Sequence, residues 1–466
     1  MLHAQRFRTF VPFVPTAFHT ARFAVALLAV AFSVALAAKA HAQITTQVLI
    51  GDSVSDPGTR YADVDEAIKR FTNRDPLGAQ QFLEAALRKN PNLPPVDLLL
   101  AKMYILSGDS ASALASLEKS AAENPTDPEP YLILGDQAIS AGQTIQAEAL
   151  YEKAISLIDG FKGNEKRKRS FVIRARTGSS LVAERRKGWA TAAADLNVLL
   201  KVDPDNAAAH YRLGRALFMQ KKFQEGNAEF AKAAQLDKNL PSASVAAALL
   251  YEQLGMRNEA KTAFESAVRA NREDVKTLNA YAQWLLSTGD VTNAEKALAA
   301  ARRVAPEDLD TLILSGVAAR MAKKMKPAED YFVSALRLSP SNAAVINQLA
   351  LLLVEQPDEE KRQRAMEFAR INAMLQPNSA ESNITLAWVL YQIGNTRDAE
   401  VALRKGLAAR NMSPDSNYLV AKILSDQNRP DVAKQFLTAA LENPAGGLSV
   451  LRTEAEALKK QLDAQP

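Results

Sequence analysis

The stretch AAAHYRLGRALFMQKKFQEGNAEFAKAAQLDKNL, residues 207–240, decides the fold of this 466-residue chain. It places one small residue, Gly214, twelve positions before another, Gly226, and an aromatic residue, Phe230, four positions further on. Blocks of this pattern follow one another in unbroken steps of 34 residues, starting at Ile173, Ala207, Pro241, Val275, Leu309 and Ala343. A fixed period of this size predicts a solenoid, in which each repeat packs only against its neighbours.

Eleven such blocks fill residues 60–447, with an eleven-residue insertion before the fourth and a three-residue insertion in the ninth. The eighth residue of each block is Ala, Gly or Ser, and the twentieth is Ala or Gly. Two helices approach closely where side chains are this small, so these positions predict where the helices of a pair cross. The expected repeats are 60–93, 94–127, 128–161, 173–206, 207–240, 241–274, 275–308, 309–342, 343–379, 380–413 and 414–447.

A bulkier side chain follows the second small residue by four positions, which places both on one face of the second helix. It is Leu, Phe or Tyr in every block except the ninth, where Ala369 takes its place. Glycines are expected to end the first helices and prolines to close the second helices. They are Gly108, Gly142, Gly255, Gly289 and Gly394, and Pro91, Pro125, Pro204, Pro306, Pro340 and Pro377.

These phased blocks resemble the tetratricopeptide repeat family over residues 60–447. The resemblance implies an all-α fold, a right-handed α-solenoid or superhelix of stacked helix–turn–helix repeats. It also implies that the protein is a scaffold that binds proteins or peptides in its concave groove. Residues 448–466 are expected to form a capping helix and tail, because Leu451, Ala455 and Leu458 belong to one apolar stripe whose opposite face is charged.

The resemblance further implies that positions 2, 5, 9, 12 and 13 of each first helix face the ligand. Aromatic and amide side chains at such positions suit extended peptides or amphipathic segments. The alternative is that several of them pack between neighbouring repeats. The residues expected in the groove are Tyr211, Arg215, Phe218, Asn279, Gln283, Asn347, Trp388, Tyr391, Tyr418 and Lys422.

Residues 1–42 have the pattern of a secretory signal peptide. A basic lead precedes an apolar run over residues 23–38, and Ala40-His41-Ala42 provides a small-x-small cleavage site before Gln43. The expected mature protein is periplasmic or secreted and begins with a polar linker, residues 43–59. The alternative is an uncleaved segment that anchors the protein to the inner membrane, although the apolar run is shorter than the roughly 20 residues of a spanning helix.

Charge is concentrated in one place. The predicted signal holds four basic residues and no acid, so the net charge of +5 falls to +1 without it, and nucleic-acid binding is not expected. Residues 161–188 carry ten bases and two acids. They are either a solvated helix extension or a docking patch for an anionic envelope component such as a lipid, a glycan or an acidic protein. The patch comprises Lys166, Arg167, Lys168, Arg169, Arg185, Arg186 and Lys187.

Catalytic groups are scarce. The chain has no cysteine and four histidines, of which only His210 lies beyond the predicted signal, so the usual ligands of a zinc site are missing and no metal or other cofactor is expected. Residues 51–56 resemble the nucleophile block of GDSL-type hydrolases, with Ser53 as the serine. The catalytic triad of these hydrolases needs an aspartate three residues before its histidine. Three residues before His210, this chain has Ala207. The protein is therefore predicted not to be an enzyme.

The sequence thus predicts an exported scaffold that binds proteins or peptides, acting in the assembly or organisation of a cell envelope. An accessory factor for the export of a glycan or another envelope polymer is the first alternative. An envelope hydrolase that uses Ser53 is the second.

Overall fold

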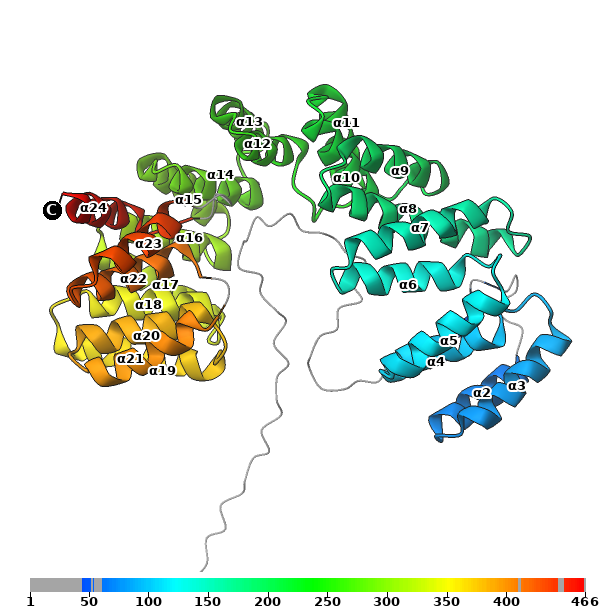
Figure 1. Cartoon of the computed structure of the whole chain (residues 1–466). Coiled ribbons are helices and arrows are strands. Elements are labelled where there is room, and N and C mark those ends of the chain that lie inside the picture. The colour runs from blue at the N-terminus through cyan, green and yellow to red at the C-terminus, as the bar shows by residue number, and fades with distance from the viewer. Residues whose placement is uncertain (1–43, 52, 54–60, 410–411, 443–447, 465–466) are drawn as a thin grey trace, which may run out of the picture. The chain divides into compact units, whose positions relative to one another are not determined.

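The computed structural model describes residues 44–51, 53, 61–409, 412–442 and 448–464, and within these ranges it forms 24 α-helices and no strand (Figure 1). The all-α prediction is confirmed. The predicted signal peptide and its cleavage point between Ala42 and Gln43 lie outside the described residues. No helix within the described ranges is both long enough and apolar enough to cross a membrane. The chain divides after Leu250 into two compact units.

The first unit consists of consecutive helix pairs joined by short turns. In each pair the two helices pack on one another, as α2 does on α3 and α10 on α11. The helices are α1 Thr46–Ile50, α2 Ala62–Thr72, α3 Pro76–Lys89, α4 Val96–Ser107, α5 Ser110–Glu123, α6 Glu129–Ser140, α7 Thr144–Ile158, α8 Glu165–Arg185, α9 Trp189–Val202, α10 Ala207–Met219 and α11 Phe223–Leu236. The boundary between the units falls within α12, Ala243–Gln253.

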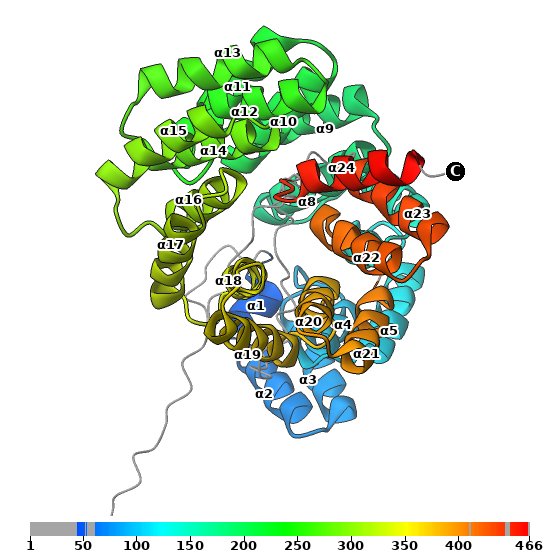
Figure 2. The same cartoon turned by 90° about the vertical axis from the view of Figure 1, so that its left-hand side faces the viewer.

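The second unit continues the same architecture. Figure 2 shows the first helices α18, α20 and α22 on the inner side of its curve and the second helices α19, α21 and α23 on the outer side. Its helices are α13 Arg257–Ala270, α14 Val275–Ser287, α15 Val291–Val304, α16 Leu309–Met321, α17 Met325–Leu338, α18 Ala343–Val354, α19 Glu359–Leu375, α20 Ala380–Gln392, α21 Thr396–Leu407, α22 Pro414–Asp426, α23 Pro430–Leu441 and α24 Arg452–Asp463.

The small residues of the repeat are buried where the helices of a pair meet. All eleven residues at the eighth position and all eleven at the twentieth are buried. A Cβ atom at Gly135 would lie 2.9 Å from Cε1 of Tyr151, and one at Gly178 would lie 2.2 Å from Cζ of the same ring. The fully buried Tyr151 ring therefore occupies space that only glycine leaves open.

The turn after each first helix uses a left-handed residue at one fixed place. The fifteenth residue has positive φ in ten of the eleven blocks, five times as glycine and five times as another residue. The ninth block departs because its three-residue insertion falls at this turn. The residues other than glycine are Arg74, Lys187, Lys221, Lys323 and Asn428, with φ between 59° and 63°.

The C-terminal helix α24 caps the second unit. Its apolar stripe, which includes Ala455 and Leu458, is buried against α22 and α23, and its outer face is charged. The Asp415 carboxylate on α22 accepts hydrogen bonds from the backbone N–H groups of Val450 and Leu451, both 3.1 Å long. These bonds satisfy donors that would otherwise have no partner as the chain turns into the cap.

Two segments differ from simple expectation. Residues 162–172 were expected as an insertion, and residues 165–172 of it form the start of α8, so that this helix has 21 residues. Residues 43–59 were predicted to be a linker, but Thr46–Ile50 form α1, which packs on α2 and α4. The linker prediction is wrong for this part, because Leu49 and Ile50 bury apolar surface that a solvated linker would expose.

Candidate functional site

An aromatic patch on the first helices α20 and α22 brings together four of the predicted groove residues. The Trp388 and Tyr391 rings stack with their centroids 6.2 Å apart. Tyr391 and Tyr418 are partly exposed, and Lys422 places its Nζ atom 2.6 Å from Oδ1 of Asp426. We call Tyr391, Tyr418 and Lys422, with the edge of Trp388, the aromatic patch.

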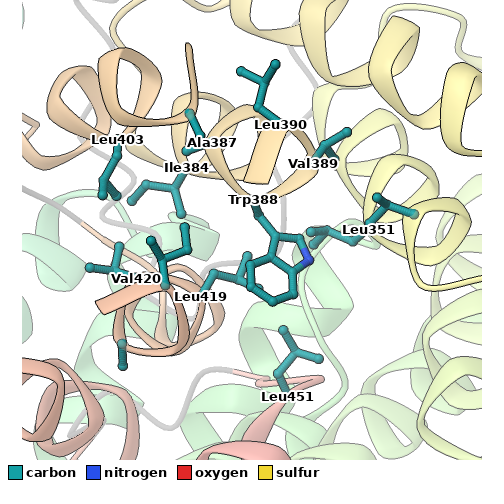
Figure 3. Close-up of a cluster of buried hydrophobic side chains, with 14 of the residues drawn as sticks. Leu351, Ile384, Ala387, Trp388, Val389, Leu390, Leu403, Leu419, Val420 and Leu451 are labelled. Carbon is teal, nitrogen blue, oxygen red and sulfur yellow. The ribbon is translucent and has the colours of Figure 1, made fainter. Parts of the chain in front are cut away.

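Trp388 contributes less to this surface than the sequence suggested. Its side chain is 7% exposed and lies among Leu351, Leu419 and Leu451 (Figure 3). The ring fills the space between successive repeats and the start of the capping segment, so Trp388 is a packing residue. Its Nε1 atom is buried and has no hydrogen-bond partner within the described residues.

The basic side chains beside the aromatic patch are paired with carboxylates. Lys422 pairs with Asp426, Arg320 with Glu355 at 2.7 Å, and Lys323 with Glu454. Burial raises the pKa of Tyr418 to about 12, and the negative charges of Glu454, Glu355 and Asp426 add to this effect. Burial and the neighbouring Asp426 likewise raise the pKa of Tyr391. Both phenols are therefore neutral hydrogen-bond donors at physiological pH.

In the fifth repeat the three predicted residues have different environments. Phe218 is fully buried between Phe223 and Phe230, with centroid distances of 4.9 and 5.9 Å, so it belongs to the core and its prediction as a contact residue is wrong. Tyr211 is partly buried, and burial raises its pKa. The guanidinium of Arg215 lies 5.2 Å from the centre of the Trp189 ring.

One of the three predicted amides joins two repeats, one is buried within a repeat, and one is partly exposed. Asn279 donates to Asp308 at 3.0 Å and accepts from Thr311 at 2.9 Å, which links the seventh repeat to the eighth. Asn347 is buried and accepts a hydrogen bond from Asn372. The prediction that Asn347 faces a ligand is therefore wrong, because the second helix covers it. Gln283 remains partly exposed on α14.

The basic segment is largely paired within the protein. Arg167 is 6% exposed and forms ion pairs with Asp127 at 2.8 Å and Glu129 at 2.6 Å. It is therefore a structural cation and cannot belong to a docking patch. Lys166, Lys168 and Arg185 donate to the carbonyl oxygens of Gly51, Asp159 and Ile139, respectively. Arg169 and Arg186 form ion pairs with Asp203 and Glu148.

Part of the basic segment remains accessible. Lys166, Arg169, Arg185, Arg186 and Lys187 are exposed, and Lys187 occupies the left-handed turn position after α8. Docking of an anionic partner stays a prediction, and it now concerns these five residues.

The two residues considered for catalysis, His210 and Ser53, are both held within the fold. Both ring nitrogens of His210 are engaged, Nδ1 with Glu229 and Nε2 with the carbonyl of Pro204. Ser53 is buried at the end of the α1 segment. Within the described ranges, no three His, Asp or Glu side chains are placed to hold a metal ion together.

Sequence reasoning missed the acidic residues beside the aromatic patch. Glu355 and Asp426 occupy position 13 of the ninth and eleventh blocks, which belongs to the predicted groove face, so a signal was present. Glu454 comes from the capping helix α24, and its approach to Lys323 depends on the stacking of three repeats.

Stacked helix pairs with small residues at each crossing define an α-solenoid whose first helices share one face. Family models described as tetratricopeptide repeat match residues 70–136, 178–242, 241–274 and 282–343. The chain belongs to the tetratricopeptide repeat family. Its repeats are modules of a kind that binds proteins or peptides.

Comparisons with individual proteins reveal more distant similarities. Cellulose synthase operon protein C of Pseudomonas fluorescens (strain SBW25) is 30% identical over 160 residues, which are 33% of this chain and 12% of that protein. Yeast Tom70 in its crystal structure is 16% identical, with coverage of 86% and 96% of the two chains and a TM-score of 0.37. A structure of MamA from Desulfovibrio magneticus RS-1 is 19% identical over 38% of this chain and 95% of its own, with a TM-score of 0.31.

Proposed function

We propose that the protein is an exported scaffold that binds a protein or peptide on its first helices, with the aromatic patch as a principal contact surface. The observation that carries this proposal is the meeting of Tyr391, Tyr418 and Lys422 on adjacent first helices. Partly exposed tyrosines bury a large area on binding and lose little rotamer entropy, which makes them effective anchors.

The electrostatics of the patch define the kind of ligand. Three ion pairs surround the rings, so the edge has no strong net charge. The neutral phenol hydroxyl of Tyr418 can donate to a main-chain carbonyl of the ligand, whereas that of Tyr391 is hydrogen-bonded to Asp426, and both ring faces can contact apolar side chains of the ligand. This supports binding of a peptide segment with apolar side chains and accessible carbonyl groups.

The test is affinity capture of partners from the native cell envelope, with the full chain as bait. A Tyr391→Ala plus Tyr418→Ala variant should lose the captured partner while its helical circular dichroism is retained. Met374→Ala, at a second-helix position that is 81% exposed, is the control and should capture normally. Equal capture by all three proteins would contradict the proposal.

Export is part of this proposal and rests on the signal pattern of residues 1–42. Sequencing the N-terminus of the native protein should identify Gln43 as the first residue. An intact Met1 on membrane-bound material would instead support an uncleaved anchor and place the scaffold at the inner membrane.

A second candidate function is an accessory role in the export of an envelope polymer. It is favoured by the similarity to cellulose synthase operon protein C, although the matched region is a small part of that protein. In the capture experiment, this role predicts that subunits of a polysaccharide synthase or exporter co-purify with the wild-type chain. Capture of envelope proteins without any such subunit would count against it.

A further inference from the structure

The first helices of the N-terminal repeats already hold a peptide segment, and it belongs to the chain itself. The helix α1 packs on α2 and α4, and residues 44, 45, 51 and 53 flank it. Leu49 and Ile50 are each 1% exposed and join the apolar cluster of the first two repeats. Gln47 and Val48 on the same short helix face solvent. The segment thus buries two adjacent aliphatic side chains, and Ile44 packs against the same cluster.

Polar contacts to this segment come from three different first helices. The Thr46 hydroxyl donates to Asp65 on α2 at 2.5 Å. Lys102 on α4 donates to the carbonyl of Leu49 at 3.3 Å, and Lys166 on α8 donates to the carbonyl of Gly51 at 2.8 Å.

These contacts have the chemistry of peptide recognition. Lys102 occupies position 9 of the second block, which is one of the ligand-facing positions. The two lysines bind main-chain carbonyls at the C-terminal end of a helical turn, where cations are favourable. The lysines bind the backbone of the segment, while the apolar cluster packs on its two aliphatic side chains.

The segment depends on this surface for its structure. A five-residue helix is far too short to be stable alone in water, so α1 forms because its apolar side chains are buried. Residues 54–60 join it to the first repeat, and such a short connection gives it a high effective concentration at the surface. An outside peptide must compete with that concentration.

We propose that the surface formed by the first helices α2, α4 and α8 is a peptide-binding site, which the chain's own segment around α1 occupies in cis. The external ligand is a protein segment that forms a short helix with two adjacent large aliphatic residues, and it binds when the chain's own segment leaves. This inference rests on the proposed function, that first helices bind peptides, and it adds a second site under the control of the N-terminal segment.

The first experiment measures binding of a fluorescent peptide with the sequence of residues 44–53 to the full chain. A Leu49→Asp plus Ile50→Asp variant, which weakens the cis segment, should bind this peptide at least tenfold more tightly than the wild type. A peptide with the same two aspartates should not bind either protein. A folded variant that binds no more tightly than the wild type, or that binds both peptides equally, would overturn the proposal.

A second experiment avoids any change to the two aliphatic residues. The chain has no cysteine, so Ser53→Cys and Val48→Cys each introduce a single thiol. Ser53 is 5% exposed and Val48 is 57% exposed, so Ser53→Cys should react with a thiol reagent at least tenfold more slowly. Excess unlabelled peptide should accelerate the reaction of Ser53→Cys and leave Val48→Cys unchanged. No acceleration would show that the segment is not displaced.

The proposal of the aromatic patch and the proposal of the cis-occupied site can be contradicted independently of each other. The aromatic patch lies on α20 and α22, so Tyr391→Ala plus Tyr418→Ala should leave peptide exchange at α2, α4 and α8 unchanged. Normal exchange together with unaltered partner capture by that variant would contradict only the role of the aromatic patch. Absent exchange with normal partner capture would contradict only the cis-occupied site.

Discussion

A Cβ atom at Gly316 in α16 would lie 2.5 Å from Cε1 of Phe332 in α17, closer than real Cβ atoms approach a neighbour. The same relationship joins Gly214 to Phe230, at 2.7 Å from Cδ1. Three blocks have glycine at the eighth position, and each has Phe or Tyr as the bulky residue of the second helix. Most blocks with alanine there have leucine instead. The two positions are therefore matched in size.

This matching predicts a strong coupling. Gly316→Ala should destabilise the protein by about 1–3 kcal/mol through overpacking, although alanine favours the helix by about 1 kcal/mol. Adding Phe332→Leu recreates the alanine–leucine pair of other repeats and should recover part of the loss. Urea unfolding of the two single variants and the double variant gives the coupling energy, which should exceed about 1 kcal/mol. Additive effects would show that the two residues do not compete for space.

Arg167 provides a second test, because it is buried between two carboxylates. Arg167→Ala should cost about 3–5 kcal/mol at neutral pH, since Glu129 and Asp127 would remain buried with less compensation. Arg169→Ala is the matched control on the same helix. Its side chain is 57% exposed, and the change should cost less than about 0.5 kcal/mol. Equal effects of the two substitutions would contradict a structural role for Arg167.

The destabilisation caused by Arg167→Ala should depend on pH in a definite direction. Burial alone would raise the pKa of Glu129, but Lys102 and Arg167 outweigh it and hold this pKa below the ordinary 4.5. In the wild type, Glu129 therefore contributes stability above pH 4.5 that is lost as the pH falls further. Without Arg167 the pKa of Glu129 should rise, so the difference in unfolding free energy between variant and wild type should shrink as the pH falls from 7 to 4. Urea melts across this range measure it.

Trp388 should act on stability more than on binding. Because the ring fills the space between repeats, Trp388→Ala should lower the unfolding free energy by about 3–5 kcal/mol. Partner affinity, corrected for the folded fraction, should change much less than in Tyr391→Ala plus Tyr418→Ala. Thermal melts and binding isotherms on the same samples separate the two effects. A stable variant with lost affinity would restore Trp388 as a direct contact.

The phenol of Tyr418 should ionise at a higher pH than the phenol of an exposed tyrosine. Burial and three nearby carboxylates raise its pKa from 10.0 to about 12, so its phenolate absorbance should appear after that of exposed tyrosines. The contribution of Tyr418 to stability is complete below pH 10 and is lost as the pH rises towards 12. Ultraviolet difference titration of the wild type against Tyr418→Phe isolates this step. Glu454→Gln should move it to lower pH, and a step at pH 10 in the wild type would contradict the described surroundings.

The left-handed lysines offer a stabilising change. Lys221 has φ of 63°, a conformation that glycine adopts without the clash of a Cβ atom. Lys221→Gly should raise the unfolding free energy by about 0.5–1 kcal/mol. Lys221→Ala retains a Cβ atom and should give no gain. Thermal melts that show the same stability for both variants would contradict this explanation of the turn.

The sequence alone was sufficient for the helical repeat and its phase. The spacing of Gly214, Gly226 and Phe230 follows from the geometry of a single helix pair, and such local periodicity is readable in any block. The apolar stripe of residues 448–466 likewise predicted the capping helix, because amphipathicity is a property of one helix. The pairing of glycine with an aromatic ring was also visible, since both partners lie within one repeat.

Only the tertiary structure decided which predicted groove residues are accessible. Phe218 and Asn347 occupy ligand-facing positions in the pattern, yet neighbouring helices cover both. Arg167 meets carboxylates 38 and 40 residues earlier in the chain, and Lys102 and Lys166 meet the α1 segment, which the sequence presented as a linker. Such contacts depend on the angle at which successive repeats stack, which is a sum of side-chain packing over many residues and leaves no local signal in the sequence.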